Sequence, residues 1–168
     1  GLYRYGGGGY HCIWFDDEDI DIFAKRNLSV ITNPASNLKL ASGIAPLKKM
    51  QEAGINLAIG TDGPASNNCL DMLREMFLVT GLAKLREHDA AVMDANDVLY
   101  MATTGGAKAM GLSDCDCLAV GKKADLFLMA VLFFPIVPAR PRTPRFRTLP
   151  WRSMPPSSKP ALRAAASV

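Results

Sequence analysis

The sequence predicts an α/β fold built from parallel strand–helix units. Three short apolar runs, residues 10–15, 28–31 and 55–59, have the length and composition of buried strands. Helical segments separate these runs, and strands that alternate with helices are typical of a parallel sheet with crossover connections. The alternation does not by itself distinguish a closed barrel from an open sheet.

Local signals support each element of the first half of the chain. Four acidic residues, 16–19, follow the first strand and suit the N-terminus of a helix, which the basic and Asn residues 25–27 close. After the second strand, Asn33-Pro34 predicts a strand end and a polar loop over 35–43. Pro46 then suits the first turn of a helix that stops near Gly54.

The sequence from about residue 70 to residue 111 predicts mainly helix. We expect one helix over about 70–85, with Met72, Met76 and Phe77 facing the core, and another from residue 94 to about 111. The apolar run 125–129, after a Gly-Lys-Lys turn, predicts a further strand.

Composition changes near residue 130, which predicts a boundary between a domain over 1–130 and a basic tail over 131–168. The tail holds six Arg, one Lys, no acidic residue and eight of the eleven prolines. Residues 1–130 carry 12 basic and 16 acidic side chains, a net charge of −4. We expect a disordered Pro/Arg-rich tail, and a shifted reading frame would explain its composition. The alternative is a genuine basic tail for nucleic acid or an anionic surface. Beyond the apolar run 131–134, its aromatic residues are only Phe146 and Trp151, without the regular spacing that would favour nucleic-acid recognition.

The remaining composition argues against several protein classes. No run approaches the roughly 20 apolar residues that span a bilayer, and the first residues lack the basic and apolar regions of a signal peptide. Four Cys do not make a disulfide scaffold in a chain of 168 residues. We therefore expect a cytoplasmic protein without a membrane partner.

Polar residues gather just after the predicted strands, where parallel sheets carry their functional sites. His11 lies in the first strand run and Asp62 directly follows the third, so both can reach one rim. Four further polar side chains follow the second and third strands: Asn33, Ser36, Asn37 and Ser66, with Asn67 beside them.

Each candidate also has a structural interpretation. Asp62 suits a helix cap or turn, and His11 could be a half-buried side chain satisfied by a carbonyl group. His88 lies in a charged stretch and is expected to be solvated. Cys115 and Cys117 form a CxC pair without a second pair or a nearby His, which does not predict a zinc site.

Three segments resemble the amidohydrolase superfamily. They are His11-Cys12-Ile13-Trp14 with the acidic residues after it, the run TNPASNLKLASG at 32–43, and the run GTDGPASNN at 60–68. The match is closest to the 5-methylthioadenosine/S-adenosylhomocysteine deaminases, with chlorohydrolases and guanine deaminases as relatives. The segment GKKADL at 121–126 is similar to the return of those chains to a small β-sandwich, and the resemblance covers about residues 1–130.

The resemblance implies a partial (β/α)₈ TIM-type barrel, with the three strands as about the last three βα units. It implies a divalent metal, usually zinc, and a small-molecule nucleoside substrate. Asp62 matches the family's metal ligand and proton shuttle, and His11 matches the His that hydrogen-bonds the attacking hydroxide.

The family's other ligands, an HxH pair and a His with a Glu three residues later, have no match here, because His11 and His88 are the only histidines. We therefore expect an incomplete, inactive fragment of a metal-dependent aminohydrolase of adenosine-type nucleosides, which hydrolyses a non-peptide C–N bond. A triazine or guanine hydrolase is the alternative within the class, and a non-catalytic interaction fragment is the alternative outside it.

Overall fold

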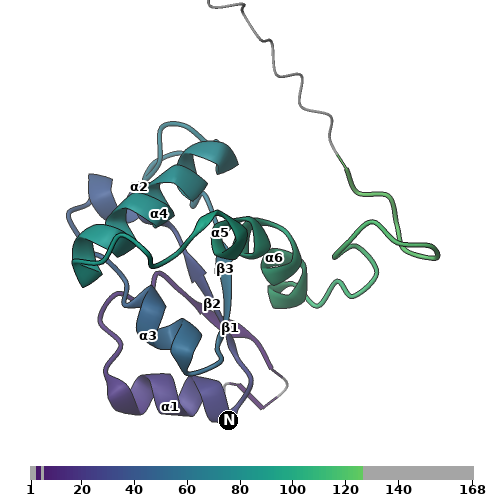
Figure 1. Cartoon of the computed structure of the whole chain (residues 1–168), viewed down its shortest axis with the longest axis horizontal. Coiled ribbons are helices and arrows are strands. Elements are labelled where there is room, and N and C mark those ends of the chain that lie inside the picture. The colour runs from purple at the N-terminus through teal and green to yellow at the C-terminus, as the bar shows by residue number, and fades with distance from the viewer. Residues whose placement is uncertain (1–2, 5, 127–168) are drawn as a thin grey trace, which may run out of the picture. The chain divides into compact units, whose positions relative to one another are not determined.

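The computed structural model describes residues 3–4 and 6–126, in which a parallel sheet of three strands forms the centre (Figure 1). The strands are β1 (Gly8–Tyr10), β2 (Ser29–Thr32) and β3 (Asn56–Ile59), in the order β1-β2-β3. This confirms the predicted α/β class, and consecutive parallel strands of this kind fit a partial TIM-type barrel. All four residues of β3 are buried, as expected for a strand covered on both faces.

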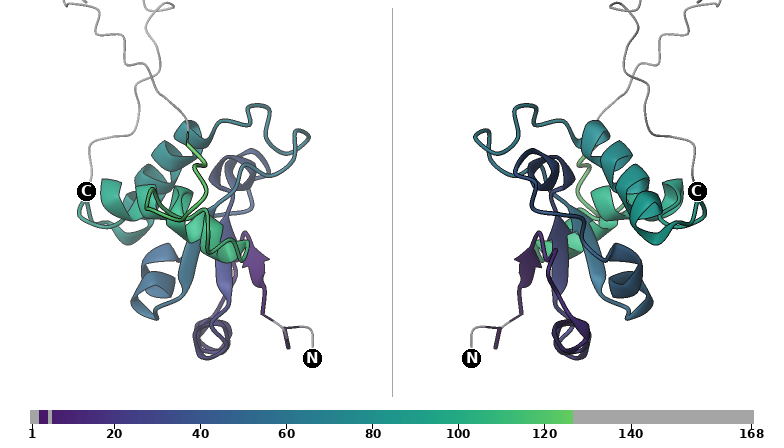
Figure 2. Two further views of the ribbon diagram at one scale, coloured as in Figure 1. Left: turned by 90° about the vertical axis from the view of Figure 1, so that its right-hand side faces the viewer. Right: turned by 90° about the vertical axis from the view of Figure 1, so that its left-hand side faces the viewer.

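Six helices accompany the strands in the described part of the chain. They are α1 (Asp17–Lys25), α2 (Pro34–Lys39), α3 (Leu47–Glu52), α4 (Met72–Glu87), α5 (Ala95–Ala102) and α6 (Thr104–Ala109). Figure 2 shows the strands side by side, and α4, α5 and α6 all contact β3. Because α2 follows β2 directly, it lies at the carboxyl end of the sheet.

The predicted acidic start of α1 is confirmed as a reciprocal cap. The Asp16 side chain accepts a hydrogen bond from the Asp19 amide at 3.0 Å, and the Asp19 side chain accepts one from the Asp16 amide at 3.3 Å. Such a capping box satisfies two amide groups that the first helical turn leaves unpaired.

The first strand was predicted at 10–15, and this is wrong. The strand is Gly8–Tyr10, and the chain turns at His11 and Cys12, which have φ angles of 64° and 48°. A Cβ on Gly8 would overlap the Ser29 carbonyl oxygen, and one on Gly9 would lie 2.6 Å from the Cys12 sulfur. The strand therefore runs through glycines because no side chain fits there.

Two helix predictions also need correction. The segment 35–43 was expected to be a loop, but its first part is α2, with Pro34 in the first turn, a position that needs no backbone N–H donor. The helix expected from 94 to 111 is divided into α5 and α6 at Thr103, whose φ and ψ angles are −122° and −93°. The strand predicted at 125–129 is absent at 125 and 126, and its remainder lies outside the described residues, as does the predicted tail.

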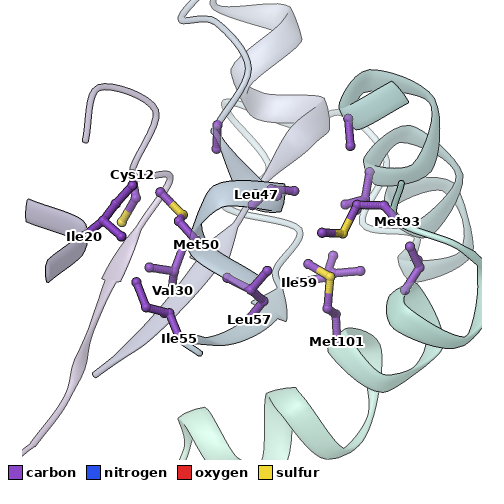
Figure 3. Packing of buried hydrophobic residues seen from close by; sticks show 14 of the residues in the cluster. Cys12, Ile20, Val30, Leu47, Met50, Ile55, Leu57, Ile59, Met93 and Met101 are labelled. Atoms are coloured by element: carbon purple, nitrogen blue, oxygen red, sulfur yellow. The ribbon is translucent and has the colours of Figure 1, made fainter. Parts of the chain in front are cut away.

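The core lies between the sheet and its helices. Figure 3 shows Val30 and Leu57 of the strands among buried side chains of the helices, including Met50 of α3 and Met101 of α5. Met72 and Met76 pack against this core as predicted, whereas Phe77 is 76% exposed and its predicted burial is wrong. No helix within the described ranges is long and apolar enough to cross a membrane.

Candidate active site

His11 lies directly after β1 and is fixed through its backbone and its ring. Its amide donates to the Ile31 carbonyl oxygen at 2.8 Å, which continues the pairing of β1 with β2. Its Nδ1 lies 2.7 Å from Asn37 Oδ1 on α2, and this contact requires a proton on Nδ1. The ring is therefore oriented with Nε2 free for a second partner.

Asn33 lies beside that second nitrogen. Its amide group is 3.4 Å from His11 Nε2. It also lies against the carbonyl oxygens of Gly60 and Thr32, and with the amide nitrogen turned to them it donates at 3.1 and 3.2 Å. This orientation satisfies both carbonyl groups and places Asn33 Oδ1 toward His11 Nε2. A proton on Nε2 then has an acceptor beside it.

Asp62 follows β3 and holds its carboxylate through three hydrogen-bond donors. Ser36 Oγ and Ser66 Oγ donate to Oδ2 at 2.6 and 2.7 Å, and the Gly63 amide donates to Oδ1 at 2.8 Å. These donors, Ser36 first, lower the pKa of Asp62 from 3.8 to about 2, and His11 adds a smaller effect in the same direction. The group is therefore a carboxylate at neutral pH, with one acceptor position of Oδ1 still unused by these donors.

The two predicted site residues meet. His11 Nε2 lies 3.7 Å from Asp62 Oδ2, although the residues come from different strands. The polar side chains predicted at the same rim from 33, 36, 37, 66 and 67 also take part in this network or in the loop that carries Asp62. The convergence expected from parallel strand ends is thus present, while the chemical roles of His11 and Asp62 stay predictions.

An open pocket of about 600 Å³ lies over this pair. His11, Ser36 and Asp62 contribute its polar lining, and Tyr10 and Trp14 contribute exposed aromatic rings. A concave surface with a few convergent polar groups and aromatic walls is typical of a small-molecule site.

Cys12, next to His11, is an unreactive thiol in this arrangement. It is 6% exposed, and burial, with a smaller contribution from Asp19, raises its pKa to about 11. A nucleophilic cysteine needs the opposite shift. The pocket therefore offers no thiol chemistry through Cys12.

The described residues do not gather the ligands of a metal ion by themselves. Within 3–4 and 6–126, no three His, Cys, Asp or Glu side chains converge as a bound ion would require. Asp62 has the charge and the free acceptor position that a metal ligand needs. His11, whose Nε2 lies 3.7 Å from Asp62 Oδ2, is a neighbouring side chain of a type that also binds metals. Cys115 and Cys117 belong to no such group among these residues.

Sequence reasoning overlooked Glu75. This residue of α4 is fully buried, and its carboxylate contacts both helix α2 and the loop after β3, which carry the rim residues. Its one signal is that it shares a helical face with the apolar residues Met72 and Val79, three positions before and four positions after it, which is not specific enough to reveal a buried carboxylate.

Comparison with known proteins assigns the chain to a family. Residues 6–156 match the amidohydrolase family model, and the chain belongs to that family. It is 49% identical over 121 residues to the 5-methylthioadenosine/S-adenosylhomocysteine deaminase of Dictyoglomus thermophilum, a match that covers 72% of this chain and 28% of that protein. It is 42% identical over 145 residues to the 5'-deoxyadenosine deaminase of Methanothermobacter thermautotrophicus, covering 86% and 31% of the two chains.

Solved structures give the same assignment. An adenosine deaminase from Xanthomonas campestris with bound zinc matches with a TM-score of 0.67 and 47% identity over 69% of this chain and 27% of that one. A triazine hydrolase variant matches with a TM-score of 0.65 and 29% identity, covering 68% and 26%. The chain thus spans about three tenths of the length of the relatives it matches.

Proposed function

We propose that this chain forms part of the active site of a metal-dependent aminohydrolase that deaminates adenosine-type nucleosides, such as S-adenosylhomocysteine or 5-methylthioadenosine. One observation carries the proposal: the Asp62 carboxylate is held by three donors at the end of β3, 3.7 Å from an oriented His11. The deaminase names of the relatives at 42–49% identity support the substrate class.

Asp62 would be the metal ligand that this chain provides. A low pKa keeps the carboxylate ionised, as a ligand must be. The metal, for which zinc is supported by the Xanthomonas campestris structure, would supply a water of lowered pKa. Further ligands would come from outside the described residues, because no group of three donors lies within them.

The same carboxylate would also move the proton of the attacking water. With a pKa of about 2, Asp62 is a weak base in the present arrangement. Proton transfer to it therefore requires the hydrogen bonds from Ser36 and Ser66 to weaken as the proton arrives. Two hydroxyl groups can rotate to act as acceptors instead, which backbone donors cannot do.

His11 would bind the attacking oxygen and stabilise the charge that develops on the substrate. Asn37 fixes Nδ1, so that Nε2 faces the space beside Asp62. Because the imidazole ring is already oriented, it does not have to move when charge develops in the transition state. The water oxygen would attack the purine carbon that bears the amine, and the proton accepted by Asp62 would pass to that amine. Cleavage of the C–N bond would then release ammonia and give the inosine-type product.

A triazine or guanine hydrolase is the second candidate, because hydrolases of triazines have the same local fold. The lower identity of the triazine hydrolase, 29% against 47–49%, favours the adenosine-type substrate. We also propose that the described residues do not catalyse the reaction alone, since they supply one carboxylate ligand.

A chimaera tests the function without requiring the chain to supply every ligand. The 121 residues of the Dictyoglomus thermophilum deaminase that align with this chain are replaced by the residues of this chain. Ammonia release from S-adenosylhomocysteine and 5-methylthioadenosine is then measured with zinc, with the unaltered deaminase as reference. The proposal predicts turnover of at least one of these nucleosides. A folded, zinc-loaded chimaera that releases no ammonia from either would contradict it.

A further inference from the structure

Glu75 is a buried carboxylate that the proposed chemistry does not use. Its side chain is completely enclosed, with an exposed fraction of 0%. Its two oxygens accept one hydrogen bond each: the Ala35 amide donates to Oε2 at 3.0 Å, and Asn67 Nδ2 donates to Oε1 at 2.7 Å. Burying a charge is costly unless donors compensate it, so these two bonds stabilise the residue in place.

The first of these bonds holds the start of α2. Asn33 precedes the helix but makes no side-chain cap, and Glu75 accepts from an amide of the first turn instead. Two site contacts depend on this helix, because Ser36 donates to Asp62 and Asn37 binds the His11 ring. Displacement of α2 would therefore alter the partners of both catalytic candidates.

The second bond holds the loop after β3. Asn67 is 1% exposed and donates both to Glu75 and to the Thr61 carbonyl oxygen, at 2.7 Å each. Its amide also donates to the Gly63 carbonyl oxygen at 2.9 Å. Asn67 thus ties the residues on both sides of Asp62 to the Glu75 carboxylate.

We propose that Glu75 is a positioning residue that sets the placement of Asp62 relative to His11 by clamping both helix α2 and the loop after β3 with one carboxylate. Both neighbours donate hydrogen bonds, so the clamp needs two acceptor atoms on one rigid group. A glutamine has the same shape but presents its NH₂ group to one of the two donors. The catalytic meaning of the clamp rests on the proposed function, whereas the clamp itself is a property of this chain.

The test uses the full chain and needs no substrate. In Glu75→Gln, two quantities are followed by NMR: the Nδ1–H proton of His11, which Asn37 holds, and backbone amide exchange in α2 and in the loop after β3. His88→Gln removes the second imidazole and assigns the signal, since the chain has two histidines. Glu87→Gln makes the same chemical change at a half-buried site on the same helix, where Glu87 pairs with Arg86. Val98→Ala, at a buried position of α5, lowers stability without changing a contact of α2 or of the loop after β3 that Glu75 makes.

The proposal predicts that Glu75→Gln broadens or removes the His11 signal and speeds exchange of the Asn37 and Gly63 amides. The expected change is on the order of tenfold or more, as for loss of a hydrogen bond to a charged group. Both control variants should leave these quantities as in the parent chain. If the His11 signal and both amides are unchanged in Glu75→Gln, or change equally in Val98→Ala, the proposal is overturned.

A second variant covers the case in which Glu75→Gln does not fold. Asn67→Ala removes only the loop side of the clamp, so it should speed exchange at Gly63 and keep the His11 signal. Equal effects of Asn67→Ala on α2 and on the loop after β3, or no effect on either, would overturn the proposal. Because neither readout involves turnover, such a failure leaves the deaminase proposal to its own test with the chimaera.

Discussion

Asp62 adopts a backbone conformation that few side chains tolerate. Its φ angle is 58°, in the left-handed region, where Asp and Asn are the residues most often found after glycine. His11 has a φ of 64° at the end of β1. Such conformations cost about 1–2 kcal/mol each and are common at functional sites. In both residues the turn brings the side chain over the carboxyl end of the sheet, and the cost is offset by the hydrogen bonds that the side chains make there.

The hydrogen bonds of Asp62 predict a specific dependence of stability on pH. Its pKa is lowered to about 2 in the folded chain, below the ordinary 3.8, so the ionised group stabilises the fold above the ordinary value. That contribution is lost as pH falls from about 4 to about 2. We expect Asp62→Asn to lose this part of the acid dependence, as measured by urea unfolding midpoints across that range.

The matched variant for this prediction is Ser66→Ala, which removes one donor and keeps the carboxyl group. The pKa of Asp62, followed by NMR of its carboxyl carbon, should then rise toward 3.8. An unchanged pKa in Ser66→Ala, together with identical acid unfolding in Asp62→Asn, would contradict the assignment of the shift to these donors.

The cysteine thiols differ in burial and pKa, which predicts different rates of alkylation. With a pKa of about 11 instead of 9.0, Cys12 has about 100-fold less thiolate near neutral pH than an ordinary cysteine, and it is buried as well. Cys69 and Cys117 are exposed. We expect iodoacetamide to label both exposed cysteines well before Cys12, as read by mass spectrometry of the peptides. Labelling of Cys12 at the rate of Cys69 would show that the turn after β1 opens readily.

At the scale of elements, the close approach of α6 to β3 depends on one glycine. A Cβ on Gly105 would overlap the Leu57 carbonyl oxygen, whereas a Cβ on the neighbouring Gly106 would meet the Met101 carbonyl oxygen at an ordinary 3.7 Å. The helix can therefore approach the strand only where the side chain is absent. Asn56 adds a hydrogen bond of 3.0 Å to the Gly105 carbonyl oxygen.

This contact predicts opposite effects of the same substitution at adjacent positions. Gly105→Ala should lower the free energy of unfolding by about 1–3 kcal/mol, because backbone must move to make room. Gly106→Ala should be neutral or raise it by up to about 1 kcal/mol, since alanine is the better helix former. Chemical denaturation measures both values. Equal stability of the two variants would contradict the packing of α6 on β3.

The sequence predicted the elements with strong periodic signals and missed those that depend on distant partners. Asp62 was placed at the rim because it directly follows the third predicted strand, which the structure bears out. His11 was placed within the first predicted strand, and it reaches the same rim because β1 ends one residue before it, at Tyr10. Helix α2 was not predicted, since Pro34 ends a strand as readily as it begins a helix. The Glu75 carboxylate, which accepts a hydrogen bond from the Ala35 amide in the first turn of α2, lies 40 residues further along the chain. The position of β1 was wrong because the apolar run after Tyr10 outweighed the glycines that pack against β2.

At the scale of the whole molecule, the described residues bring together the two side chains that we propose act in catalysis. They position a carboxylate and an imidazole, and the group of three donors that a metal needs is absent from residues 3–4 and 6–126. Its matches span about three tenths of their relatives. The arrangement is therefore expected to act together with the other ligands of an amidohydrolase site.

The full chain is therefore not expected to bind zinc tightly. We expect micromolar zinc to leave its thermal unfolding midpoint unchanged, because a tightly bound ligand raises that midpoint by mass action and a site with one carboxylate binds weakly. Differential scanning calorimetry with and without a chelator measures the effect. A clear stabilisation that Asp62→Asn abolishes would show that the chain contains a complete ligand set.

The most direct test of the central claim is the turnover number of the chimaera carrying Asp62→Asn. Because Asp62→Asn removes the proposed metal ligand and proton acceptor, we expect kcat to fall by a factor of about 100 to 10,000. The control variant Asp97→Asn changes an acidic residue in the first turn of α5, outside the pocket lining, and should retain the activity of the chimaera. An Asp62→Asn chimaera that keeps its zinc and its turnover number would contradict the assignment of this carboxylate to the active site.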